Sequence, residues 1–398
     1  MTQNYFSNFN LKTTSADKFF SVLPDLYLSG ALVQVDPDNL LLLLGPFQGN
    51  QTSQNEYNSS EDQDSVRLKN KQFQVSLSTQ KFFESFNGWV TPKAAYLFSL
   101  HEIKEKFKTF AVGASQRQEH EAFLDLNQWV AKQKSEYEES YQLILKMIHQ
   151  EQIEKAVPST TFSHPLKMNY DLFLLGLKNL FAGQSGQTVS QSLYAYSSEG
   201  SGFFGLTPEY LFEYKDKNLK SMALAGTVKK DDKETKSSIL KNKKLRHEHQ
   251  LVVDDIKSVL GKYGFVKVSE TDILELPFLY HLITKIEVLN AKAIFEQLIK
   301  SLHPTPALGV SPRNFGFHWL GKLQSEVNKD FHGAPLTVKI GNEFCKSFVC
   351  IRNIQWNSSG MKVVVGGGLV KDSRLDEEWQ ELENKKKAVL KSFGAREL

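Results

Sequence analysis

From residue 153 to residue 366 the chain alternates groups of short β-rich runs with single helical stretches, and this order constrains the fold most. The runs of strand length, rich in β-branched and aromatic residues, are "IEKAVPSTTF", "SLYAYSS", "YLFEYK", "LYHLITKIEVL", "FCKSFVCIRNIQW" and "MKVVVGG". Helical patterns fall at about 240–262, 290–302 and 376–394. Because the helices do not alternate regularly with the strands, the sequence predicts an α+β fold with largely antiparallel sheets.

The first 150 residues carry weaker signals. "ALVQVDPDNLLLLLG" predicts strand, turn and strand, with the turn at Asp-Pro-Asp-Asn. The segment 49–65 has almost nothing apolar to bury, and we expect a mobile surface loop there. Residues 116–150 read as mainly helical, with apolar positions such as Phe123, Leu126, Val130, Leu143 and Met147.

Composition excludes several classes of protein. The net charge of +3 argues against a dedicated nucleic-acid binder. The apolar run "LLLLLGPF" is too short to span a membrane, and the N-terminus does not resemble a secretory signal. Cys345 and Cys350 lie five residues apart in a strand-like run, on opposite faces, so they are not expected to bridge each other. Together these features favour a cytoplasmic protein.

The stretch "LRHEHQLVVDD" raises the question of a metal site. Residues two apart on a helix point roughly 200° apart, so His247 and His249 cannot face one ion. Glu248 could point inward alone, or it could be an ordinary solvated residue. The chain has no HExxH motif, and two cysteines cannot make a cysteine-rich zinc site.

A second acidic helix is predicted at "LDEEWQELENKKKAVL", where Glu378 and Glu381 share one face. One interpretation is an exposed amphipathic helix in which Glu381 pairs with Lys385. The other is a magnesium site, since magnesium prefers hard oxygen ligands, keeps some water and bridges to an anionic ligand.

Two features could receive such an anion. Arg352, in the apolar run "FVCIRNIQW", either faces solvent or binds a carboxylate. Gly366, Gly367 and Gly368 follow a strand, where they could aim backbone N–H groups at an anion or merely form a bend.

Taken in order, nine segments resemble the chorismate-utilising enzymes and, within them, the isochorismate synthases. The segments are "IEKAV" (153–157), "GLTPEYLF" (205–212), "ALAGT" (223–227), "RHEHQLVVDDI" (246–256), "HLITKIE" (281–287), "LHPTPALG" (302–309), "CIRN" (350–353), "VVGGGLV" (364–370) and "EEWQELENK" (377–385). The resemblance implies one large domain whose sheets pack as a sandwich with helices outside. It assigns the catalytic, chorismate-binding core to 151–398 and leaves 1–150 as an N-terminal part of the same domain.

The resemblance also implies roles for individual residues. Glu248 and Glu378 would bind Mg²⁺, with Glu381 as a third or water-mediated ligand, and the ion would polarise the ring carboxylate of chorismate. Arg352, Lys385 and the N–H groups of Gly366 to Gly368 would receive the enolpyruvyl carboxylate. The remaining substrate-binding positions implied are Gly226, Thr227, His281, Ala307 and Leu308.

The same resemblance makes Lys155 the base that activates water and Glu209 the general acid. A catalytic lysine needs a depressed pKa, and a carboxylic acid that donates a proton needs a raised one. The implied activity is the isomerisation of chorismate to isochorismate, in menaquinone or siderophore biosynthesis. We expect a monomer without an amidotransferase partner, since water and not ammonia is the nucleophile.

Two alternatives remain beside this interpretation. A salicylate synthase would go on to eliminate pyruvate, but such relatives tend to carry Gly-Thr where this chain has Ala307 and Leu308. The other alternative is a catalytically silent chorismate-binding protein. The chain also departs from the family pattern at Val310, His332, Ala334 and Thr337, and His332 takes a position that is usually aromatic.

Overall fold

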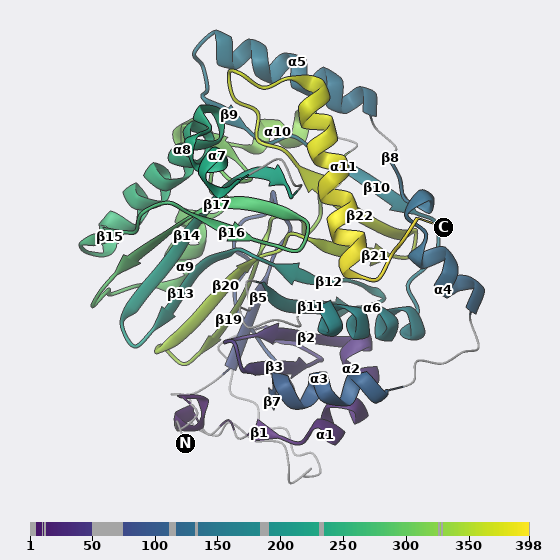
Figure 1. Ribbon diagram of the computed structural model, residues 1–398. Helices are drawn as coiled ribbons and strands as arrows, with labels where there is room; N and C mark the ends of the chain where they lie inside the picture. The colour runs from purple at the N-terminus through teal and green to yellow at the C-terminus, as the bar shows by residue number, and fades with distance from the viewer. Residues whose placement is uncertain are drawn as a thin grey trace.

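The protein is described here from a computed structural model that covers residues 5–9, 11, 13–49, 75–110, 117–131, 134–183, 191–230, 235–324, 327 and 329–397. Within these residues the strands form two ten-stranded sheets and one small two-stranded sheet (Figure 1). The pairings are antiparallel except that between β1 and β7 (Thr13–Thr14 and Ala94–Ser99). The predicted loop at 49–65 lies outside the described residues except for Gly49.

The first sheet contains strands from both halves of the sequence. Its order is β1, β7, β3 (Asn39–Leu44), β2 (Ser29–Gln34), β11 (Ser192–Ser198), β12 (Ser201–Thr207), β21 (Asn353–Asn357), β22 (Gly360–Gly366), β10 (Ser159–His164) and β8 (Val130–Ala131).

The second sheet also contains strands from both halves of the sequence. Its order is β15 (Val266–Val268), β17 (Leu279–Val288), β14 (Asn218–Lys229), β13 (Tyr210–Lys215), β20 (Phe344–Val349), β19 (Pro335–Ile340), β5 (Val75–Thr79), β6 (Val90–Thr91) and β4 (Gln48–Gly49), and β16 (Asp272–Glu275) also pairs with β17. The two-stranded sheet joins β9 (Lys155–Ala156) to β18 (Val310–Ser311).

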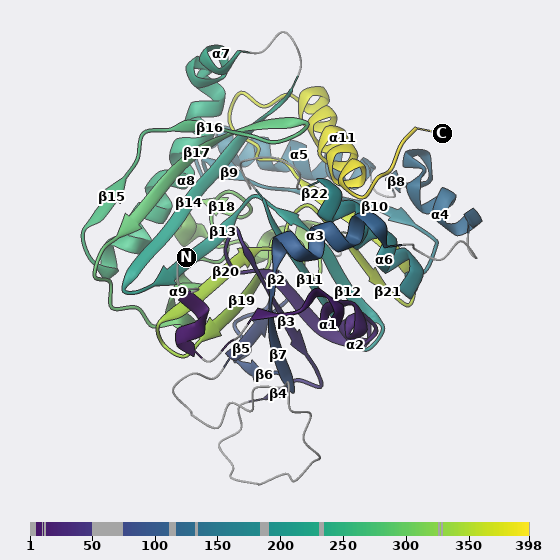
Figure 2. The ribbon, with the colours of Figure 1, turned by 60° about the horizontal axis from the view of Figure 1, so that its bottom comes forward.

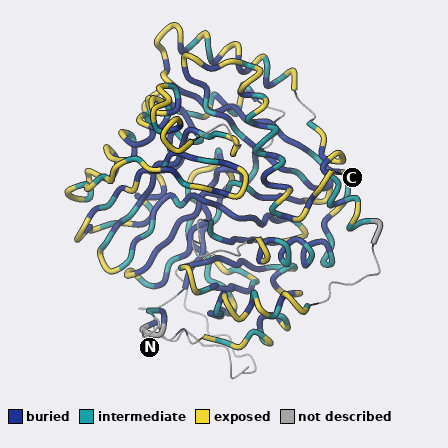
Figure 3. Tube along the Cα trace, viewed as in Figure 1, coloured by how far each residue is buried: buried dark blue, intermediate teal, exposed yellow. Residues whose placement is uncertain are grey.

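Helices cover the outer faces of the sandwich. They are α1 (Ala16–Ser21), α2 (Leu23–Leu28), α3 (Leu100–Thr109), α4 (Arg117–Leu124), α5 (Lys134–His149), α6 (Tyr170–Gly183), α7 (Lys236–Lys241), α8 (Lys243–Leu260), α9 (Phe295–Leu302), α10 (His318–Leu323) and α11 (Leu375–Ser392). Buried side chains of α3, α6 and α11 pack on the first sheet, and those of α8 and α9 pack on the second. Figure 3 shows the exposed residues mainly on this outer layer.

A third hydrophobic core lies between the two sheets. Val33 and Leu41 of the first sheet pack there with Leu77, Leu336 and Phe348 of the second. Figure 2 shows the N-terminal strands β2, β3 and β7 beside β5 at this side of the molecule. The prediction of an α+β sandwich of largely antiparallel sheets, with helices outside, is confirmed.

Two sequence predictions were wrong in detail. "FCKSFVCIRNIQW" is two strands, β20 and β21, because the chain leaves one sheet and enters the other between them. Arg352 lies in this break with φ of 60°, outside any strand. In 116–150 the helix is interrupted by β8, and Val130 and Leu143 are exposed because the first is on an edge strand and the second on the outer face of α5.

Other expectations agree with the structure. The turn between β2 and β3 is closed by Asp36, whose carboxylate accepts the N–H groups of Asp38 and Asn39. Cys345 and Cys350 are free and buried in different cores, on opposite faces of the sheet. Of the described helices, none has the length and apolar character that crossing a membrane requires.

Candidate active site

The candidate site lies where the chain crosses between the two sheets. The connection from β12 to β13 carries Glu209, and the connection from β20 to β21 carries Arg352. A cavity opens at these crossings and is lined by eleven of the predicted residues, namely Glu209, Gly226, Thr227, Glu248, His281, Ala307, Leu308, Arg352, Gly366, Gly368 and Lys385. Segments far apart in sequence therefore converge on one cavity.

Four predicted residues do not line this cavity: Lys155, Gly367, Glu378 and Glu381. Lys155 is buried directly beside it, in contact with Glu248, and Glu378 is buried on α11. A second, larger cavity lies beside Lys81, Asp330 and Lys362. It contains none of the predicted residues, and Asp330 pairs with both lysines, so the chemistry is better placed in the first cavity.

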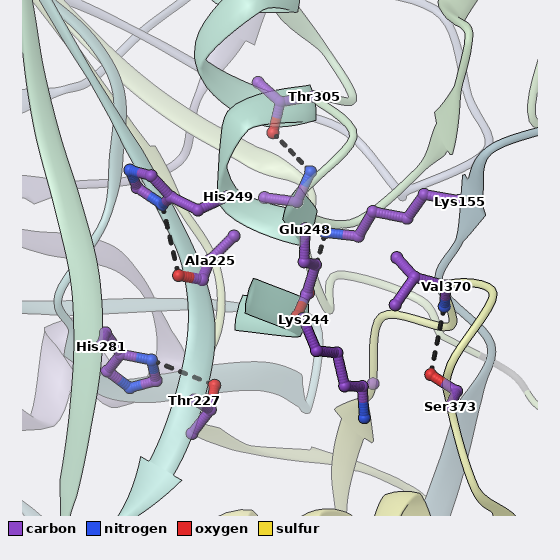
Figure 4. A network of polar contacts seen from close by, with 12 residues as sticks. Lys155, Ala225, Thr227, Lys244, Glu248, His249, His281, Thr305, Val370 and Ser373 are labelled. Carbon is purple, nitrogen blue, oxygen red and sulfur yellow. Dashed lines mark hydrogen bonds and ion pairs between the residues drawn. The ribbon is translucent and has the colours of Figure 1, made fainter. Parts of the chain in front are cut away.

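Glu248 and Lys155 form an ion pair beside the cavity (Figure 4). Lys155 Nζ lies 2.9 Å from Glu248 Oε1, and the lysine side chain is fully buried. On α8, His247 points to solvent, and His249 is buried with Nε2 2.8 Å from the Thr284 hydroxyl. The glutamate of the "RHEHQ" stretch thus faces the cavity, and the two histidines do not.

Glu209 is held by the backbone at the sheet crossing. Its N–H donates to Thr207 Oγ1 at 3.2 Å, and its carbonyl accepts the N–H of Val349 at 3.1 Å. Burial raises the pKa of its carboxyl group to about 8, although the charge of Lys155 acts in the opposite direction. The carboxyl group is therefore protonated at neutral pH.

Arg352 is oriented by a short hydrogen-bonded chain. Its Nη2 donates to His281 Nε2 at 3.1 Å. His281 Nδ1 lies 3.1 Å from Thr227 Oγ1, as Figure 4 shows. Because arginine can only donate, Nε2 of His281 must accept and Nδ1 must carry the proton. Burial lowers the pKa of Arg352 to about 10, which leaves it charged at neutral pH.

The three predicted metal ligands are each paired with a lysine. Besides the pair of Glu248 with Lys155, Glu378 Oε1 lies 2.7 Å from Lys244 and Glu381 Oε1 lies 2.6 Å from Lys385. Glu378 is only 2% exposed, and burial followed by the charge of Glu381 raises the pKa of its carboxyl group.

Lys244 has a central place among these acids. Burial acts to lower the pKa of its ammonium group, but the hydrogen bond to Glu378 and the charges of Glu378, Glu381 and Glu248 together raise it. Sequence reasoning missed this residue, although it stands one helical turn before Glu248 and so shares its face. Lys244 is thus a cation placed near three carboxylates. These carboxylates offer the hard oxygen ligands that Mg²⁺ prefers. In the described part of the chain no three acidic, histidine or cysteine side chains form a closed metal cluster, so any ion here needs water and an anionic ligand as well.

The glycine run makes a close approach to these groups. A Cβ on Gly368 would lie 2.3 Å from Glu248 Oε1 and 2.7 Å from Lys155 Cε. The N–H of Gly367 donates to the carbonyl of Pro158 at 3.2 Å, so it is not available to a carboxylate. This bond ties the glycine run to the residue that follows Val157, and the assignment of the N–H groups around Gly366 to Gly368 to the substrate stays a prediction.

Gly368→Ala is expected to leave the fold intact and to reduce turnover by about tenfold or more. The added methyl group meets the flexible ends of two side chains, which must move apart. In the matched variant Gly367→Ala the new Cβ would come no closer than 3.5 Å to any atom, so a much smaller loss is expected. The measurement is kcat/KM, with thermal unfolding as the control for folding. Equal losses of kcat/KM in both variants would contradict the role given to the close approach at Gly368.

Comparison with known proteins places the chain in a family. Residues 27–394 match the family described as chorismate binding enzyme. The chain is 32% identical over 211 residues to the isochorismate synthase MenF of Haemophilus influenzae, covering 51% of this chain and 48% of that protein. It is 26% identical over 274 residues to the vibriobactin-specific isochorismate synthase of Vibrio cholerae, covering 65% and 67%.

A solved structure shows the same fold. The 2,3-dihydroxybenzoate-specific isochorismate synthase DhbC from Bacillus anthracis superimposes with a TM-score of 0.72 at 17% identity, covering 96% of this chain and all of that one. By sequence, the chain spans about half the length of the first curated relatives that it matches.

Proposed function

The chain belongs to the chorismate binding enzymes, and from this premise we propose that it isomerises chorismate to isochorismate. The observation that carries the proposal is the cavity itself. It places a buried carboxyl group with a raised pKa, a lysine–glutamate ion pair and an oriented arginine around one space. Relatives named as isochorismate synthases support the same activity.

The proposed reaction replaces one hydroxyl group by another on the ring. Water adds at C2 while the ring double bonds shift and the hydroxyl group at C4 departs, so the product is an isomer of the substrate. Lys155, acting as a neutral amine, takes one proton from the attacking water, and this balances the proton that the departing hydroxyl group receives. Glu209, protonated at neutral pH, gives a proton to the departing hydroxyl group.

The other residues bind and orient the substrate. Arg352 and Lys385 receive the enolpyruvyl carboxylate, and His281 fixes the direction of the guanidinium group. A magnesium ion held by Glu248 and Glu378, with Glu381 directly or through water, would supply Lewis-acid polarisation of the ring carboxylate. Ala307 and Leu308 line the cavity without a hydroxyl group, which supports isochorismate rather than salicylate as the product.

The proposal also covers the location, the oligomeric state and the pathway of the protein. We place it in the cytoplasm as a monomer that uses water and needs no ammonia-supplying subunit. Its product would enter menaquinone or siderophore synthesis. Among its relatives, one is named as vibriobactin-specific and another for salicylate biosynthesis.

An isotope experiment tests the proposed reaction. Chorismate is incubated with the protein and magnesium in H₂¹⁸O, and the product is analysed by mass spectrometry. We expect one ¹⁸O atom in isochorismate, attached at C2, because the new hydroxyl group comes from water. Isochorismate without ¹⁸O would contradict the role given to water.

Magnesium is expected to stabilise the wild-type protein against heat. An ion present at about one hundred times its dissociation constant adds roughly 2.7 kcal/mol to the free energy of unfolding. The gain should be lost in Glu378→Gln and kept in Glu383→Gln, because Glu383 lies on the same helix but pairs with Lys386. The measurement is the thermal unfolding midpoint of each protein with and without Mg²⁺. An unchanged wild-type midpoint at saturating Mg²⁺ would contradict the assignment of a metal site.

A further inference from the structure

A row of hydroxyl groups runs along β10 between the two cavities. Because side chains alternate between the faces of a strand, Ser159, Thr161 and Ser163 point to the same face. The neighbours of the first two across the ladder are Gly366 and Val364, and both of these line the first cavity. Ser163 lines the second, larger cavity. The row is about 13 Å long, and it therefore reaches from the candidate site to the larger cavity.

Two hydroxyl groups of this row are buried without partners. Ser159 is 1% exposed and Thr161 is 7% exposed, and neither hydroxyl oxygen makes a hydrogen bond to any described residue. A Cβ on Gly366 would lie 3.0 Å from Ser159 Oγ, so the missing side chain leaves this hydroxyl group open toward the first cavity. Since buried polar groups are normally paired with protein or with ordered water, the two hydroxyl groups indicate buried water molecules as their partners.

The turn between α10 and β19 covers this face of the sheet. The N–H of Phe331 donates to Gln355 Oε1 at 3.4 Å, and Gln355 Nε2 donates to the carbonyl of Lys329 at 3.3 Å. Lys362, which pairs with Gln355 across the ladder, donates to Asp330 Oδ2 at 2.6 Å. These bonds hold the turn over β21 and β22, so the hydroxyl row lies between the sheet and a cover.

The cover also supplies donors beside the row. The ammonium group of Lys329 is buried over the ring of Phe82, 4.4 Å from the centroid. Among the described residues its acceptor is the carbonyl of Val157, at 3.5 Å. An ammonium group has three N–H donors, so Lys329 can also donate to water. Because Val157 lies two residues before Ser159, this ammonium group is placed at the end of the row near the first cavity.

We propose that water molecules bound along Ser159, Thr161 and Ser163 connect the two cavities and deliver the water that attacks the substrate. The inference rests on the proposed function, in which each turnover consumes one water molecule and releases another. The second cavity has a volume of about 480 Å³, which holds many water molecules. A route along β10 admits water from the side while substrate fills the first cavity. Ser159 and Thr161 are then positioning residues that bind water, and Lys155 and Glu209 carry the proton transfers.

The test compares Thr161→Val with Thr160→Val, because valine keeps the shape of threonine and removes the hydroxyl group. Thr160 is the matched control. Its hydroxyl group is also buried without a partner among the described residues, but it points to the opposite face of β10, where Phe162 packs in the core under the helices. Steady-state kinetics are measured on both variants, with thermal unfolding as the control for folding.

We expect Thr161→Val to lower kcat by about two- to tenfold, the loss for one neutral hydrogen bond, with KM for chorismate unchanged. Thr160→Val should keep the wild-type kcat. Thr161→Ser keeps the hydroxyl group and should recover most of the rate. The inference is overturned if correctly folded Thr161→Val is as fast as Thr160→Val, or if Thr161→Ser is no better than Thr161→Val.

A high-resolution crystal structure gives a readout apart from activity. In the wild-type protein we expect ordered water within hydrogen-bond distance of Ser159 Oγ and Thr161 Oγ1, and Thr161→Val should lose the water at residue 161. No water on either hydroxyl group, in a protein that makes isochorismate, would overturn this inference alone. Ordered water at both positions in a protein that makes no isochorismate would overturn the proposed function, while the water sites themselves would stand.

Discussion

Glu209→Gln is expected to reduce kcat by about 10² to 10⁴, the range that general acid catalysis contributes. Glutamine keeps the size and hydrogen-bonding shape of the protonated acid but cannot give a proton to the departing hydroxyl group. The matched control is Glu213→Gln, four residues along the chain in β13, where the carboxylate pairs with Lys346 at 3.2 Å outside the cavity. Steady-state kinetics on both variants decide the role of Glu209, and a control as slow as Glu209→Gln would contradict it.

The pH dependence of the wild-type protein follows from the same residue. Because the pKa of Glu209 is raised to about 8, we expect kcat to fall as the pH rises through that value, and this alkaline limb to vanish from the residual activity of Glu209→Gln. An unchanged limb in the variant would assign the titration to another group.

Stability should change with pH in a related way. The unfolded chain releases the Glu209 proton near pH 4.5, whereas the folded protein keeps it until about pH 8. Between these values the wild-type protein loses stability as pH rises, because its unfolded state binds fewer protons. Relative to wild type, Glu209→Gln should therefore gain on the order of 4 kcal/mol across this window. Urea unfolding at pH 5 and pH 8.5 measures the difference, and no gain would mean that the carboxyl group is not strongly desolvated.

Lys155→Gln is the second substitution with a large expected effect. It removes the proposed base, and kcat should fall by about 10² to 10⁴ while the fold is retained. The matched control is Lys386→Gln. This lysine is also buried and pairs with an acid, Glu383, but it lies over the ring of Phe162 and does not line the cavity. We expect Lys386→Gln to keep its activity, and equal loss in both variants would point to general destabilisation.

The sequence could predict the fold class because the signals were local. Runs of β-branched and aromatic residues at strand length marked β11, β13, β17 and β22, and helical patterns marked α8 and α11. The break between β20 and β21 was not predictable in this way. Both strands are buried over almost their whole length, and the change of sheet at Cys350 to Arg352 depends on pairing with strands more than one hundred residues away.

The candidate site was predicted mostly by resemblance. The structure adds burial and tertiary contacts, which the spacing of residues in the sequence does not reveal. The burial of Lys155, the position of Lys244 among three carboxylates and the unpartnered ring of His332 are tertiary facts. The hydrogen bond from the N–H of Gly367 to Pro158 could not be predicted, because a strand-end glycine looks the same in sequence whether its N–H is free or bonded.

The most direct test of the central claim is a turnover assay with purified protein, chorismate and Mg²⁺, in which the products are separated by chromatography. The proposed function predicts isochorismate as the product, with formation that stops on adding EDTA and falls sharply in Lys155→Gln. Salicylate and pyruvate as main products, or chorismate binding without any product, would contradict it.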